Sequence, residues 1–123
     1  KAKRRAYFYM NDLLNKKCAP CDGGILAFDI AEIHKYQKKV DGWHLKKNKK
    51  NIYFLEKSFT FKNFTNSQNF ISKVGEISEN ENHHPDISFG WGYAKIIIST
   101  HAIEGLSEND FILAAKIDQI SNV

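Results

Sequence analysis

Apolar residues recur at spacings of three and four in three stretches of the chain. These residues are Ile33, Tyr36 and Val40, then Phe70, Ile71, Val74 and Ile77, and finally Phe111, Ala114, Ala115 and Ile117. Such spacing places apolar side chains on one face of a helix. We therefore predict three helices, the first over about 30–39, the second from a cap at Thr65 or Asn66 to about Asn80, and the third from Ser107 onward.

Between these helices, apolar and polar residues alternate with the two-residue period of a β-strand. The alternation is clearest over 53–61, a strand beginning at Trp43 precedes it, and two further strands are expected after Pro85 and over 94–101. Each pair of strands should form a hairpin. The order αββαββα predicts an α+β fold, an antiparallel four-stranded sheet with helices on one face.

Length and charge indicate one domain with a basic segment in front of it. The chain has 123 residues, 42% hydrophobic and 26% charged, which suits a single globular domain. Residues 1–17 carry six basic side chains and one acidic one, so residues 18–123 are nearly neutral despite the net charge of +4. Because residues 1–17 show no clean period, we expect a solvated appendage that is dispensable for fold and activity.

Membrane and nucleic-acid partners are not expected. No apolar run approaches the roughly 18 residues that a membrane helix needs. The lysines around Asn48 are interpreted as a solvated hairpin tip, and neither basic segment resembles a base-reading module. Cys18 and Cys21 have no second cysteine pair with which to complete a zinc site, so free thiols in a reducing compartment are expected. The expected location is the cytoplasm, with the nucleus and an N-terminal targeting segment left open.

Candidate chemistry is concentrated between residues 79 and 110, which hold three of the five histidines. Histidine titrates near neutral pH, as a proton-transfer site requires. His83 and His84 are adjacent, and Pro85 favours an extended backbone at His84. Neighbouring extended residues point in opposite directions, so the two rings should have distinct roles.

The spacing of these residues resembles the signature of the pterin-4a-carbinolamine dehydratases. Its members in this chain are Glu79, His83, His84, Pro85, Trp91, His101 and Asp110. The runs Ser99-Thr100-His101 and Cys18 to Gly24 support the resemblance, which covers about 18–120. It implies the same αββαββα fold, with assembly into homodimers or homotetramers.

The resemblance implies dehydration of a 4a-hydroxytetrahydropterin, with His83, His84 and His101 as acid–base catalysts and without metal or cofactor. We expect His84 and His101 to exchange protons with the substrate and His83 to position or assist. The expected pterin contacts are Glu79, Asn82, Trp91, Ser99 and Thr100. Relatives often carry an acidic residue where Asn82 stands, and Asp110 is also consistent with a simple helix cap.

Three other interpretations stay open. The resemblance also implies proteins that act as a dimerisation cofactor for a transcription factor, and such binding through the helical face would not need the histidines. His83, His84 and His101 could instead converge on a zinc ion. The third alternative is a domain that binds pterin without catalysis.

Overall fold

A computed structural model describes residues 12–19 and 25–121 of the chain. Its elements are α2 (Ile30–Gln37), β1 (His44–Lys47), β2 (Tyr53–Thr60), α3 (Phe64–Glu81), β3 (Asp86–Gly90), β4 (Tyr93–Ile98), the 3₁₀ helix η1 (His101–Ile103) and α4 (Glu108–Ser121). This order of helices and strands confirms the predicted αββαββα arrangement. None of the helices in the described part is long and apolar enough to cross a membrane.

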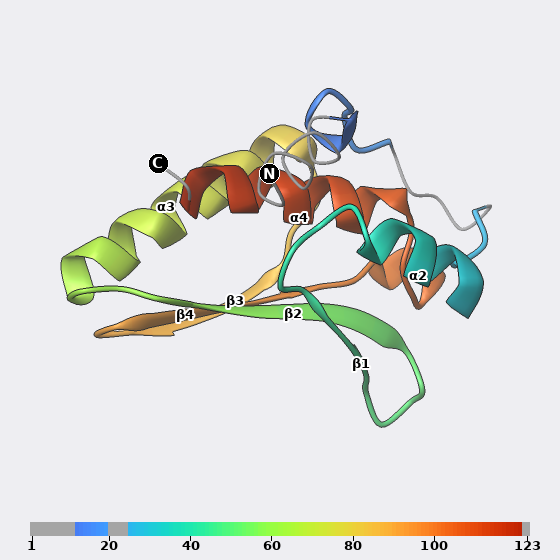
Figure 1. Ribbon diagram of the computed structural model, residues 1–123, viewed down its shortest axis with the longest axis horizontal. Helices are drawn as coiled ribbons and strands as arrows, with labels where there is room; N and C mark the ends of the chain where they lie inside the picture. The colour runs from blue at the N-terminus through green and yellow to red at the C-terminus, as the bar shows by residue number, and fades with distance from the viewer. Residues whose placement is uncertain (1–11, 20–24, 122–123) are drawn as a thin grey trace.

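The four strands form one antiparallel sheet in the order β1-β2-β4-β3. Helices α3 and α4 lie side by side over one face of this sheet (Figure 1). The core fills the space between the two layers, where Leu55, Ile96 and Ile98 from the sheet and Val74 and Phe111 from the helices are buried. The helices therefore cover one face of the sheet, as predicted.

The strand register places the turn between β1 and β2, the turn between α3 and β3 and the loop after β4 at the same end of the sheet. Leu55 near the start of β2 pairs with Ile98, the last residue of β4. Asp86, the first residue of β3, pairs with Ile97 on the other side of β4. The end of β4 is therefore flanked by the start of β3 on one side and by the start of β2 on the other. The segment with His83 and His84, before β3, and the segment with His101, after β4, both lie at this end.

Two predicted boundaries differ from the structure. Helix α3 begins after Asn63, whose side-chain oxygen accepts the Asn66 backbone N–H at 2.8 Å, so the cap is Asn63 rather than Thr65 or Asn66. Strand β4 ends at Ile98 rather than at residue 101. The chain leaves the sheet there because the backbone of Thr100 pairs with Gly105, which closes a short loop containing η1.

Part of the N-terminal segment is packed onto the domain. Leu13 is fully buried in the core, Lys16 Nζ lies 2.7 Å from Glu108 Oε2, and Lys17 Nζ donates to the Asn80 carbonyl. This corrects the expectation that the whole of residues 1–17 is a solvated appendage. The packing was not visible in the sequence because the residues that Leu13 and Lys16 contact are distant in the chain. Residues 1–11 and Cys21 lie outside the described residues.

Candidate active site

The two adjacent histidines lie in a turn that the end of α3 fixes. Asn82 adopts the left-handed conformation, with φ of 51°, and its N–H bonds to the last turn of α3. The His83 N–H then donates to the Ser78 carbonyl at 3.1 Å, which satisfies a carbonyl at the helix end. Pro85 follows, and β3 begins at the next residue. Both rings therefore project from a short segment with little conformational freedom.

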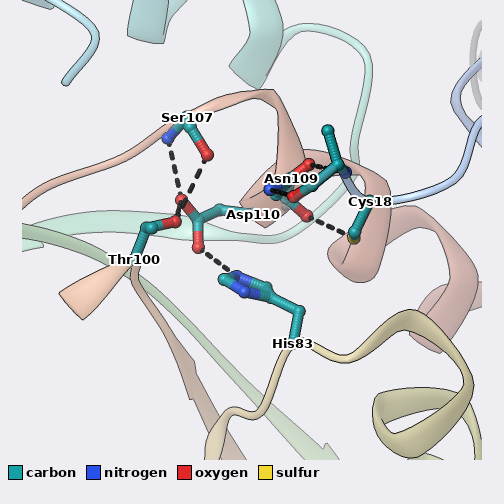
Figure 2. A network of polar contacts seen from close by, with 7 residues as sticks. Cys18, His83, Thr100, Ser107, Asn109 and Asp110 are labelled. Carbon is teal, nitrogen blue, oxygen red and sulfur yellow. Dashed lines mark hydrogen bonds and ion pairs between the residues drawn. The ribbon is translucent and has the colours of Figure 1, made fainter. Parts of the chain in front are cut away.

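His83 contacts a buried carboxylate. Its Nε2 lies 2.8 Å from Oδ1 of Asp110, which is fully buried, and the His83 side chain itself is only 11% exposed. Figure 2 shows that Asp110 Oδ2 also accepts hydrogen bonds from the Thr100 hydroxyl, at 2.7 Å, and from the Ser107 N–H, at 2.8 Å. The network thus joins the turn after α3, the loop after β4 and the start of α4.

The network determines which nitrogen of His83 carries hydrogen. An ionised carboxylate can only accept hydrogen bonds, and the Thr100 hydroxyl and the Ser107 N–H, which both donate to Asp110, suit that form. His83 must then donate from Nε2, which leaves Nδ1 of the neutral ring as an acceptor. Asp110 is consequently more than a helix cap, because it orients a histidine as well.

His84 forms a second histidine–carboxylate pair in a different environment. Its Nε2 contacts Oε2 of Glu79, which lies in the last turn of α3. The His84 side chain is 55% exposed and that of Glu79 is 78% exposed. A carboxylate is disfavoured at the C-terminal end of a helix by the helix dipole, and the contact with His84 gives Glu79 a reason to be there. The two neighbouring histidines therefore meet different surroundings.

His101 is the first residue of η1 and is exposed. Together with Ser99 and Thr100 it lines a cavity of about 490 Å³. Asn48, Lys49 and Lys50, from the turn between β1 and β2, line the same cavity. His101 thus lies at the sheet end that also carries His83 and His84.

Not every expected pterin contact lies near the histidines. Trp91 occupies the turn between β3 and β4, 68% exposed, at the opposite end of β3 from Pro85. Five strand residues separate the two ends, which corresponds to about 17 Å at ~3.3 Å per residue. Asn82 serves as the cap of α3, and the backbone of Thr100 is bonded to that of Gly105. Glu79 contacts His84, and Ser99 and Thr100 line the cavity beside His101.

A polar cluster joins the N-terminal segment to the two long helices. Glu81 accepts the Cys18 backbone N–H at 2.9 Å and contacts Lys116 Nζ. Burial alone would raise the pKa of Glu81, but the bonds from Lys116 and Cys18 outweigh it and hold that pKa below its ordinary value. Burial, together with the charge of Glu81, raises the pKa of the Cys18 thiol to about 12. A raised pKa leaves less of the reactive thiolate at neutral pH, which fits a structural role for Cys18.

Metal ligands are not grouped in the described part of the chain. Within residues 12–19 and 25–121, no set of three or more histidine, cysteine, aspartate or glutamate side chains is placed to hold a metal ion.

The sequence profile of the family "Pterin 4 alpha carbinolamine dehydratase" matches residues 27–120. The chain belongs to this family. A relative from Rubrobacter xylanophilus is 41% identical over 111 residues, covering 90% of this chain and 100% of that protein. A relative from Methylococcus capsulatus is 45% identical over 109 residues, covering 89% and 93%. The names of both proteins assign them pterin-4-alpha-carbinolamine dehydratase activity provisionally.

Two solved structures share the fold. One is described as a transcriptional coactivator/pterin dehydratase from Brucella melitensis, with a TM-score of 0.69 and 24% identity over 76% of this chain and 97% of that one. The other is described as a pterin dehydratase-like protein that is a RuBisCO assembly factor in the α-carboxysome, with a TM-score of 0.56 and 23% identity over 65% and 89%. The resemblance first drawn from the histidine signature is therefore confirmed at the level of family and fold.

Proposed function

We propose that this protein dehydrates 4a-hydroxytetrahydropterins to quinonoid dihydropterins in the recycling of tetrahydrobiopterin or a related pterin. Membership of the dehydratase family supports the reaction. The observation that carries the proposal for this chain is the pair of histidine–carboxylate contacts, one buried at Asp110 and one exposed at Glu79, in a single turn.

The reaction consists of two proton transfers around one bond change. The C4a–O bond breaks, the departing hydroxyl takes up a proton and leaves as water, and N5 loses its proton as the C4a–N5 double bond forms. No electrons leave the pterin, so neither an oxidant nor a reductant is needed. Imidazoles can donate and accept these protons near neutral pH, each with a contribution of about 10²- to 10⁴-fold.

The histidines are suited to unequal roles. His84 and His101 are exposed and can reach a bound substrate, so we assign them the proton exchanges with the leaving hydroxyl and N5. His83 is mostly buried and bonded to Asp110, which suits a ring that positions the substrate or assists through Nδ1.

The pterin ring presents N3–H and a 2-amino group as neighbouring donors. An exposed carboxylate can accept both, and Glu79 is an exposed carboxylate in contact with His84. Ser99 lies in the wall of the cavity beside His101. We propose that Glu79 and Ser99 hold the ring, with Asn82 and Thr100 shaping the turn and the loop from which these contacts arise. Trp91 would contact pterin only if the substrate extended far along β3.

A second function as an interaction partner is a separate proposal. The Brucella melitensis protein is described as a coactivator as well as a dehydratase. We propose that any such partner, and a second copy of this chain in a dimer or tetramer, would bind outside the histidine turn. Replacing the three histidines should then abolish turnover and leave partner capture and oligomeric state unchanged.

The direct test supplies the carbinolamine continuously from a pterin-dependent aromatic hydroxylase and follows its loss with and without this protein. We expect this protein to accelerate dehydration, and to do so equally well after it has itself been treated with a chelator, because the proposed steps need no metal. Tight pterin binding without acceleration would favour the non-catalytic alternative. Chelator-sensitive turnover with stoichiometric zinc would favour the metal alternative.

A further inference from the structure

The cavity beside His101 is built from two segments that are far apart in the sequence. Ser99, Thr100 and His101 line it from the loop after β4, and Asn48, Lys49 and Lys50 line it from the turn between β1 and β2. The strand register explains the meeting, because the end of β4 lies next to the start of β2 and therefore next to the turn between β1 and β2. A molecule in contact with His101 thus has two lysines within the same cavity.

These two lysines differ from the other two in the same hairpin. Lys46 forms an ion pair with Glu56 at 2.8 Å, and the Lys47 ammonium lies over the ring of Tyr53. The ammonium groups of Lys49 and Lys50 have no ion-pair partner among the described residues. One carboxylate, Glu104, lies in the same cavity, so the two lysines leave its wall with a net positive charge.

The tip that carries the lysines has a defined backbone. The side-chain oxygen of Asn48 accepts the N–H groups of Lys50, at 2.8 Å, and Ile52, at 3.0 Å. Asn51 adopts the left-handed conformation, with φ of 64°, and its N–H bonds to the Asn48 carbonyl. A preorganised tip places the lysines beside the cavity with less loss of entropy on binding.

The chemistry of the pterin ring connects this cavity to the substrate. N5, whose proton is removed, is bonded directly to C6, and C6 carries the variable side chain of pterins. C6 is two bonds from C4a, so its side chain begins three bonds from C4a, close to the histidines that exchange protons there. With His101 as one of them, the side chain starts beside the cavity that His101, Lys49 and Lys50 line.

We propose that this cavity binds the C6 side chain of the substrate and that Lys49 and Lys50 select side chains carrying an anionic group, a phosphate ester or a carboxylate. The inference rests on the proposed function, because it takes the pterin ring to lie against His101. Lysine recognises a phosphate or carboxylate as a compact positive charge, without demanding one bonding geometry. The preference should weaken as salt screens the charges.

The test compares the binding of three stable dihydropterins to the full chain at low salt. One has a neutral 6-hydroxymethyl group, one is its phosphate ester, and the third is dihydrofolate, whose tail ends in carboxylates. We expect about tenfold tighter binding of at least one anionic compound than of the neutral one, as two lysines in a partly screened cavity would give. Comparison of the phosphate ester with dihydrofolate shows whether the cavity prefers a phosphate or a carboxylate.

Two double variants show whether the lysines cause the preference. K49Q/K50Q should reduce it to about twofold or less and leave the affinity for the neutral compound unchanged, as a change confined to charge would do. K38Q/K73Q removes the same charge from exposed lysines outside the cavity and should retain the preference. Equal binding of all three compounds, or a preference that survives K49Q/K50Q, would overturn the proposal.

Failure of the proposed function would look different. The wild type would then bind an anionic dihydropterin through these lysines without accelerating carbinolamine dehydration. Failure of the side-chain selection alone would leave turnover intact with no dependence on side-chain charge.

Discussion

Replacement of Asp110 by asparagine tests whether the buried carboxylate sets the state of His83. The asparagine of D110N would keep the size of the side chain and one oxygen, which can still accept the Ser107 N–H and the Thr100 hydroxyl as Oδ2 does. The other oxygen becomes an NH₂ group at the position 2.8 Å from His83 Nε2. Two donors would then face each other, so His83 must move its hydrogen to Nδ1.

The expected change in the free energy of unfolding follows from the hydrogen bond that D110N removes and the weaker one that the switched His83 ring regains. A hydrogen bond to a charged group contributes about 1.5–3 kcal/mol, and the switched ring regains a neutral bond of about 1 kcal/mol. We therefore expect D110N to lower the free energy of unfolding by about 0.5–2 kcal/mol, measured by urea denaturation. The kcat/KM for dehydration should fall about 10- to 100-fold, mainly through KM, because Nδ1 of His83 no longer accepts a hydrogen bond that would position the substrate.

Nitrogen NMR of the His83 ring reports the tautomer directly. The wild type should carry hydrogen on Nε2, and D110N should carry it on Nδ1. Ser107→Ala is the matched control, since it removes the hydroxyl 3.2 Å from Thr100 Oγ1 but keeps the N–H that bonds to Asp110. An unchanged His83 tautomer in D110N, or a kcat/KM for dehydration equal to that of the wild type, would show that Asp110 does not set the state of this ring.

Four further predictions concern the cluster between the N-terminal segment and the helices. L13A should lower the free energy of unfolding by about 2–5 kcal/mol, because it opens a cavity at a fully buried position; a melting temperature equal to that of the wild type would show that the segment does not pack. K116M should cost about 3 kcal/mol at neutral pH by leaving the buried Glu81 without its cation, and urea titration of K116M beside the exposed-lysine variant K73M would measure it. The pKa of Glu81 is lower in the folded state than in the unfolded state, where it is about 4.3. The ionised carboxylate therefore stabilises the fold fully above the unfolded pKa, and this stabilisation is lost as the pH falls through the folded pKa. The difference in free energy of unfolding between the wild type and E81Q should accordingly shrink as the pH falls through the folded pKa. The Cys18 thiol, with its pKa raised to about 12, should react with iodoacetamide at neutral pH far more slowly than a free cysteine, and rapid labelling of Cys18 located by mass spectrometry would contradict its burial.

The periodicity of the sequence was sufficient to predict the order of elements. Ile96 and Ile98 alternate with more exposed residues, and Phe70 and Val74 recur at helical spacing, so each element could be recognised from its own residues. Their packing follows from the need to bury one face of each. The fold class and the αββαββα order required no long-range information.

The features that could not be predicted from the sequence depend on contacts between residues that are far apart in the chain. Asp110 matched the spacing of the family signature but looked equally like a cap, because its bond to His83 spans 27 residues. The burial of Leu13 and the location of Trp91 at the far end of β3 are likewise properties of the folded chain. The spacing of apolar residues identifies a helix or a strand, whereas a functional site depends on how helices and strands contact one another in the folded chain.

The proposed function requires three histidines to perform or assist the proton transfers, and replacing each by glutamine tests this requirement. Glutamine keeps some hydrogen bonding and removes titration. The remaining two histidines, His34 and His44, are exposed and provide matched controls. The measurement is kcat for carbinolamine dehydration, with circular dichroism to verify the fold.

We predict that H84Q and H101Q lower kcat by about 10²-fold or more, that H83Q acts more through KM, and that H34Q and H44Q match the wild type. Near-normal kcat in H83Q, H84Q and H101Q alike, with pterin still bound, would mean that these histidines do not carry out the chemistry.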